Sequence, residues 1–104
     1  MPSNTTSRMF FCVYVLESLR DHQRYIGYTD NLKNRIKEHE NGESFSTKSR
    51  LPIKLIYFEG CLDEVDAKRR EHYLKTTQGR RFLGLRLKNY KKQSQSAFNG
   101  RFIY

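Results

Sequence analysis

The chain has 104 residues and a formal net charge of +9, because 20 lysines and arginines face 11 acidic residues. This length allows one domain with one modest core and excludes a second domain with a core of its own. A positive surplus of this size suits a polyanionic partner. We rank nucleic acid first and an anionic membrane surface second, and an inert basic surface is the plain alternative.

Two features bear on the compartment. The longest apolar run, residues 9–16, is too short to span a bilayer, and Glu17 ends it without the small-residue cleavage site of a signal peptide. Cys12 and Cys61 sit inside apolar runs, which favours core packing, and without matching histidines they make no zinc site. Nothing requires a disulfide between them. We therefore expect a reducing, cytoplasmic compartment and no membrane association.

The first elements form a hairpin. Residues 1–8 are polar and are expected to be disordered. Phe10–Leu16 is apolar on both faces, which predicts a central strand. A polar connection at residues 18–23 leads to a second short strand at Tyr25–Tyr28. The first two strands are therefore predicted to pair antiparallel.

A helix follows the hairpin. Thr29 or Asp30 can cap a helix through residues 32–39, which Asn41-Gly42 ends. Residues 43–52 then form a polar, partly basic loop.

The second half adds a strand and two helices. Residues 53–58 predict a third strand, and Asp63 can cap a helix that runs to about Thr76. A third helix is predicted after Gly79, over residues 81–87. The resulting order, β-β-α-β-α-α, indicates a small mixed α/β layer fold.

The predicted domain spans residues 9–90, and residues 91–104 form a basic, polar tail. The tail stays low in apolar content until Phe102-Ile103-Tyr104. We expect it to be mobile or to dock through these three residues, which are also a candidate surface for a homodimer or a protein partner.

The second strand carries a candidate substrate contact. Tyr25 and Gly27 share one face, since side chains alternate along a strand. Gly27 is expected to leave open space beside Tyr25, where a substrate or backbone can approach closely. The plain alternative is that Gly27 marks a bulge and that Tyr14 and Tyr25 are core aromatics.

The first helix places Arg35 and His39 on the side of its apolar stripe. An arginine there must either pair with an anion or remain partly exposed to solvent, and a phosphate matches the geometry of its guanidinium group. Snorkelling of Arg35 towards solvent is the plain alternative. For His39 the plain alternative is an exposed surface histidine.

The second helix carries Glu71, four residues after Ala67 and three before Leu74, beside an apolar strip. A carboxylate in that position costs desolvation unless it is paired or binds a metal. The plain alternative is an ion pair with Arg70, Lys75 or Arg35.

Basic residues gather in the second half of the chain. Most are expected to form a solvated face, and some to contact phosphates without distinguishing sequence. The candidates for nucleic-acid binding are Lys48, Arg69, Lys75, Arg80 and Arg81.

Together these residues resemble the GIY-YIG nuclease domain. Its second signature triplet is present as Tyr25-Ile26-Gly27, and Cys12-Val13-Tyr14 stands where Gly-Ile-Tyr would be. Arg35 follows Tyr25 by ten positions, and Glu71 falls on the later helix where the family holds its metal. The resemblance covers roughly residues 10–87 and is similar to the N-terminal nuclease domain of the repair protein UvrC.

The resemblance implies a small central, mostly antiparallel three-stranded sheet flanked by helices, an α+β variant of the α/β class. It implies a metal-dependent DNA endonuclease that hydrolyses phosphodiester bonds in repair, recombination or processing. Glu71 would hold Mg²⁺ or Mn²⁺, and Arg35 would neutralise charge on the phosphate. Tyr14 would be the base or would orient the water, and as a base it would need nearby positive charge, from Arg35 or the metal, to lower its pKa from about 10. Tyr25 would support Tyr14 or contact the phosphate, and His39 is a candidate proton relay.

Two positions depart from the UvrC-like pattern. Tyr28 stands where those members have a lysine, and Leu83 stands where they have an asparagine. The alternative function is therefore a catalytically weak or inactive nucleic-acid-binding domain of the same fold. Nothing in the chain resembles a sequence-reading module, so we expect it to recognise DNA structure rather than sequence.

Overall fold

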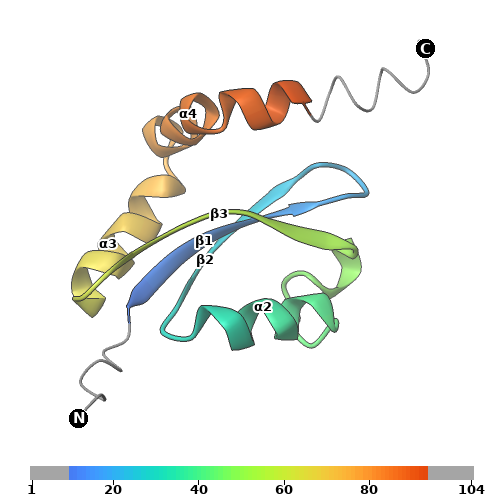
Figure 1. Ribbon diagram of the computed structural model, residues 1–104, viewed down its shortest axis with the longest axis horizontal. Coiled ribbons are helices and arrows are strands. Elements are labelled where there is room, and N and C mark those ends of the chain that lie inside the picture. The colour runs from blue at the N-terminus through green and yellow to red at the C-terminus, as the bar shows by residue number, and fades with distance from the viewer. Residues whose placement is uncertain (1–9, 94–104) are drawn as a thin grey trace. The chain divides into compact units, whose positions relative to one another are not determined.

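The computed structural model describes residues 10–93. The described elements are β1 (Phe11–Ser18), β2 (Arg24–Thr29), α2 (Leu32–Glu40), the 3-10 helix η1 (Lys48–Arg50), β3 (Ile53–Cys61), α3 (Glu64–Leu74) and α4 (Thr77–Arg86) (Figure 1). The predicted order β-β-α-β-α-α is confirmed. The predicted disordered segment, residues 1–8, and the apolar end, Phe102–Tyr104, lie outside the described residues.

The sheet has the strand order β2-β1-β3, and both pairs of neighbouring strands are antiparallel. β1 is central, as its apolar faces predict, and every residue from Cys12 to Ser18 is buried. Tyr14 pairs with Gly27 of β2 and with Phe58 of β3. A register shift between Val15 and Leu16 marks a bulge against β3.

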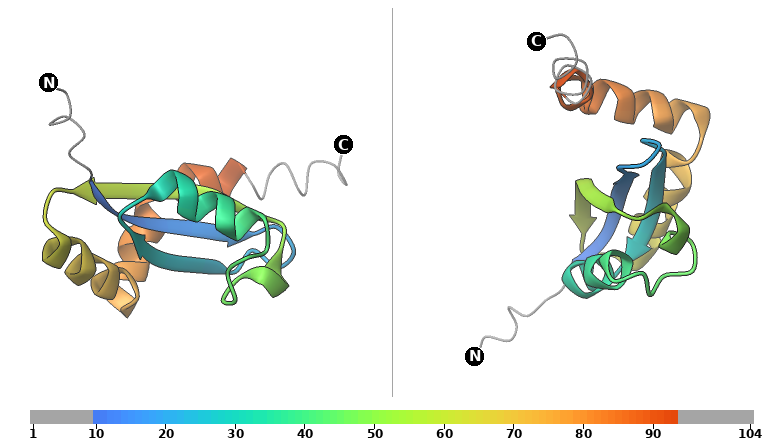
Figure 2. Two further views of the ribbon diagram at one scale, coloured as in Figure 1. Left: turned by 90° about the horizontal axis from the view of Figure 1, so that it is seen from below. Right: turned by 90° about the vertical axis from the view of Figure 1, so that its right-hand side faces the viewer.

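Helices pack on both faces of this sheet. α2 lies along the face that carries Tyr14, as the different views show (Figures 1 and 2). α3 contacts the opposite face, where Arg70 donates to Glu59 over 2.9 Å and Tyr28 donates to Glu64 over 3.1 Å. The sheet therefore forms a middle layer between α2 and the first part of α3.

The start of α2 corrects the predicted cap. Asn31 caps the helix, with its side-chain oxygen accepting from the Asn34 amide over 3.2 Å. Thr29 acts one step earlier, because its hydroxyl accepts from the Asn31 amide over 3.0 Å. Thr29 and Asn31 therefore share the stabilisation of the helix start, and a run of polar residues does not by itself show which one is the cap.

The chain divides into two compact units after His72. In the second unit, Thr76 caps α4 by accepting from the Gly79 amide over 3.1 Å, so the helix begins before Gly79 rather than after it. A Cβ at Gly79 would overlap the Tyr73 carbonyl. Glycine is therefore needed for α4 to fold back closely against the end of α3.

Cys12 is buried and Cys61 is half-buried, and both are free thiols. Core packing is thus confirmed for Cys12 and only partly for Cys61. Within residues 10–93, no helix combines the length and the hydropathy needed to cross a membrane.

Candidate active site

Tyr14 lies at the centre of the site, with only 1% of its surface exposed. Its ring crosses the β2 strand at Gly27, and a Cβ at Gly27 would overlap the Tyr14 hydroxyl and ring. The prediction that Gly27 leaves open space is therefore wrong, because the Tyr14 side chain of the paired strand fills that space. Glycine at this position lets the Tyr14 hydroxyl pass over β2.

His39 is fully buried at the end of α2, which contradicts the plain alternative of a surface histidine. Its Nε2 lies 2.9 Å from the Tyr14 hydroxyl, and its Nδ1 lies 2.6 Å from the Thr47 hydroxyl. Both ring nitrogens are thus hydrogen-bonded, which allows an imidazole to be buried without an unsatisfied polar atom.

Arg35 joins the site from one turn earlier in α2. Its Nε donates to the Tyr14 oxygen over 3.3 Å, and its Nη1 pairs with Glu38 over 2.7 Å. The side chain is 34% exposed, so part of the guanidinium stays accessible. These two partners raise the pKa of Arg35, which keeps it positively charged at every working pH.

One arrangement of protons satisfies all three of these hydrogen bonds. Because the Tyr14 oxygen accepts from Arg35, we assign the phenolic proton to the bond with His39 Nε2. His39 then carries its own proton on Nδ1 and donates it to Thr47. The result is a continuous chain, Arg35–Tyr14–His39–Thr47, in which each side chain is held by its neighbours.

The electrostatics keep both central groups neutral. Burial raises the pKa of Tyr14 above its ordinary 10.0, and this outweighs the lowering effect of the bond from Arg35. Burial lowers the pKa of His39 below 6.5, with help from the positive charge of Arg35. Arg35 alone therefore does not lower the Tyr14 pKa as a base would need, because loss of solvent dominates over one neighbouring cation.

Tyr25 and Glu71 complete the predicted set. The Tyr25 ring centre lies 6.3 Å from that of Tyr14 and 5.4 Å from that of His39. Glu71 is half-buried on α3, and its negative charge is one of the influences that raise the pKa of Tyr14. Four predicted residues therefore contact one another directly or through aromatic rings, and Glu71 is linked to them by electrostatics.

The loop after α2 supplies residues that the sequence analysis missed. Thr47 holds His39, and Ser46 donates to the Tyr25 hydroxyl over 3.4 Å. A cavity of about 220 Å³ opens beside Tyr25, between this loop and the apolar side chains of Leu16 and Ile53. The loop has no hydrophobic period, and its only signal was a run of hydroxyl residues three to eight positions after the helix stop.

The family follows from comparison with known proteins. Residues 10–91 match the model of the GIY-YIG catalytic domain, which covers most of the chain. The chain belongs to the GIY-YIG family. The match includes β1, β2, α2, β3, α3 and α4.

Curated relatives of this GIY-YIG protein include several UPF0213 proteins. One from Clostridium perfringens is 44% identical over 64 residues, which cover 61% of this chain and 68% of the relative. One from Bacillus licheniformis is 43% identical over 63 residues, 60% of this chain and 64% of the relative. One from Oceanobacillus iheyensis is 34% identical over 82 residues, 78% of this chain and 92% of the relative. No solved structure matches the chain significantly.

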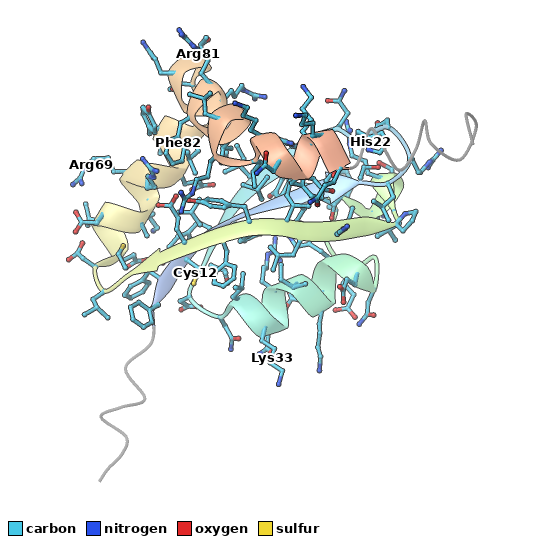
Figure 3. The ribbon with its side chains drawn as sticks, turned by 45° about the horizontal axis from the view of Figure 1, so that its top comes forward. Cys12, His22, Lys33, Arg69, Arg81 and Phe82 are labelled. Carbon is cyan, nitrogen blue, oxygen red and sulfur yellow. The ribbon has the colours of Figure 1, made fainter. Side chains whose placement is uncertain are left out.

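The cations predicted to bind nucleic acid are all exposed on this GIY-YIG domain. Arg69 projects outward from α3 and Arg81 from α4 (Figure 3). Arg69 pairs with Asp66 over 2.9 Å, and the Arg80 side chain lies 3.4 Å from the Lys75 carbonyl. Lys48 lies in the first unit with Arg69, whereas the other three belong to the second unit.

The metal that the family implies must fit the donors present. Among residues 10–93, no three histidine, cysteine or acidic side chains come together as a metal cluster. Glu71 offers one carboxylate, whose charge acts on Tyr14. Mg²⁺ is commonly held by one or two carboxylates, with waters and substrate phosphate oxygens completing its shell. One carboxylate of this kind is compatible with Mg²⁺ or Mn²⁺ whose remaining ligands are waters and phosphate oxygens.

Proposed function

We propose that this GIY-YIG protein is a metal-dependent DNA endonuclease that hydrolyses phosphodiester bonds in repair, recombination or processing. The observation that carries the proposal is the hydrogen-bonded chain Arg35–Tyr14–His39–Thr47. It joins a cation suited to phosphate with a phenol and a neutral imidazole, which together can move a proton.

Tyr14 acts as the base with His39 as its relay. Its raised pKa opposes a free phenolate, so the phenolic proton has to leave as a new one arrives. An attacking water gives its proton to the Tyr14 oxygen while the phenolic proton passes over 2.9 Å to His39 Nε2. The water oxygen forms the bond to phosphorus as the bond from phosphorus to the leaving 3′ oxygen breaks, and that oxygen takes up a proton from solvent.

Arg35 stabilises the charge that develops on the phosphate. Its guanidinium is fixed by Tyr14 and Glu38, and its accessible part is free to meet a phosphate oxygen. Tyr25 supports the Tyr14 and His39 rings and lines the adjacent cavity. Glu71 would hold the Mg²⁺ or Mn²⁺, which when bound supplies Lewis-acid polarisation of the phosphate and stabilises the leaving oxygen.

The test is cleavage of plasmid and branched DNA with Mg²⁺ or Mn²⁺. Glu71→Ala should abolish cleavage, whereas Glu64→Ala should retain it. Glu64 is the matched control, because it is an exposed glutamate on the same helix whose partners are Tyr28 and Lys68. Equal cleavage by wild type and Glu71→Ala, or no metal-dependent cleavage by wild type, would contradict the proposal.

A second candidate is a binding domain that has lost the chemistry. One observation favours it. Leu83, at the position where UvrC-like members carry asparagine, is 2% exposed within the second unit and so provides no polar group. Such a protein would bind DNA in a salt-dependent way, Glu71→Ala would leave that affinity unchanged or raise it, and no metal would give turnover.

We propose a cytoplasmic location for the protein, and its two free thiols support this proposal.

A further inference from the structure

The loop between α2 and η1 presents an aromatic ring to solvent. Phe45 is 86% exposed, the highest value among the large hydrophobic side chains that the structure describes. The Lys48 ammonium lies 5.3 Å from the centre of its ring. An exposed phenylalanine adds almost nothing to folding, because its apolar surface is not removed from water.

The turn beneath Phe45 is held firmly. Its neighbours Ser44 and Thr47 are buried, and the Ser44 carbonyl accepts from the amides of Thr47 and Lys48 over 3.2 and 2.9 Å. Thr47 is bonded to His39. The ring is thus exposed at the tip of a fixed turn.

This turn is attached to the candidate active site on both sides of Phe45. Ser46, the next residue, bonds to the Tyr25 hydroxyl, and Thr47 bonds to the proton relay. A single exposed aromatic residue is ordinary on a protein surface. Here the Phe45 ring is next in sequence to Ser46, whose side chain contacts Tyr25, and the Lys48 ammonium lies beside the ring.

The chemistry of this pair selects one kind of ligand. An exposed aromatic face stacks on a nucleobase that is itself unstacked, and a base inside a duplex has both faces covered. A neighbouring lysine contacts the backbone phosphate without distinguishing sequence. The combination therefore favours an unpaired nucleotide over an intact duplex.

We propose that Phe45 is a stacking platform for an unpaired nucleobase of a DNA strand, with Lys48 on the adjoining phosphate. The inference rests on the proposed nuclease function and specifies its substrate, namely DNA with unpaired nucleotides close to the scissile bond. A flap, a bulge or a single-stranded gap satisfies this requirement, and a continuous duplex does not.

The experiment measures binding separately from cleavage. Oligonucleotides with 2-aminopurine in an unpaired flap or in a duplex are titrated with the full chain in EDTA, by fluorescence and anisotropy. Wild type should quench the flap probe and bind it more tightly than the duplex. Phe45→Ala should weaken flap binding roughly 5- to 150-fold, the range of one base–aromatic stack, and change duplex binding less than about twofold.

Two variants serve as controls. Phe45→Tyr keeps an aromatic face and should restore quenching and affinity. Phe10→Ala removes another exposed phenylalanine, at the opposite end of β1 from the loop, and should behave as wild type. Equal flap affinity of Phe45→Ala and wild type, or equal losses for flap and duplex, overturns the inference.

The outcome is independent of the nuclease test. If wild type cleaves with metal but Phe45→Ala keeps its flap binding and quenching, the stacking platform fails while the proposed function stands. If stacking depends on Phe45 but no metal gives turnover, the platform stands and the endonuclease proposal fails.

Discussion

The contact between Gly27 and Tyr14 gives a prediction with a worked magnitude. Gly27→Ala places a Cβ inside the Tyr14 hydroxyl and ring, so the ring has to move away from His39 and Arg35. Overpacking costs about 1–3 kcal/mol, and unsatisfied buried hydrogen-bonding groups cost about 1–3 kcal/mol more. We expect the free energy of unfolding to fall by roughly 2–6 kcal/mol, and activity to be lost.

Urea unfolding followed by circular dichroism measures this change, together with the melting temperature. A loss of that size should lower the melting temperature by at least about 8 °C in a domain of this length. The matched control is Gly84→Ala in α4, where an added Cβ meets no atom within 4 Å. Because alanine is the better helix former, Gly84→Ala should stabilise the protein by about 0.5–1 kcal/mol. Similar effects of the two substitutions would refute the reasoning.

Two further predictions concern the buried imidazole. Thr47→Val leaves His39 Nδ1 without its partner and should lower the free energy of unfolding by about 1–3 kcal/mol, whereas Thr47→Ser should keep most of it. Urea unfolding of both variants checks this, and equal stability of Thr47→Val and Thr47→Ser would contradict it. Because burial and Arg35 hold the pKa of His39 below 6.5, the unfolded chain binds a proton first as the pH falls. The contribution of His39 to the free energy of unfolding should therefore be constant above pH 6.5 and decline below it. Urea unfolding at several pH values should show a smaller decline for His39→Gln than for wild type.

The fold was predictable because its signals are local. β1 is apolar on both faces and is the central strand, and the polar connection at residues 18–23 gave the hairpin. The predicted helix boundaries differ from the observed ones by a few residues, because the position of a cap depends on a single hydrogen bond. The sequence analysis placed the start of α4 after Gly79, because glycine often ends a helix. In the structure Gly79 lies inside α4, where its close approach to the Tyr73 carbonyl leaves no room for a side chain.

The site was predictable only where spacing determined it. Tyr14, Tyr25 and Arg35 come together because register and helical period place them on one face. The burial of His39 and the role of Thr47 were not predictable in this way. A polar loop residue has no period, and whether a histidine is buried depends on two partners that lie far from it in the sequence or follow a turn.

The polar chain through Tyr14 and His39 is more than folding requires. The sheet already buries a core of β1 side chains, and the face of β1 towards α2 could be closed by apolar residues of similar size. Replacing both partners of a buried polar contact by such residues is often neutral or stabilising, whereas removing one is costly. A buried phenol–imidazole pair with an arginine at its accessible end is what the proposed nuclease function requires, since that function has to move a proton and bind a phosphate. The fold tolerates this buried pair because Arg35 and Thr47 complete the hydrogen bonds of Tyr14 and His39.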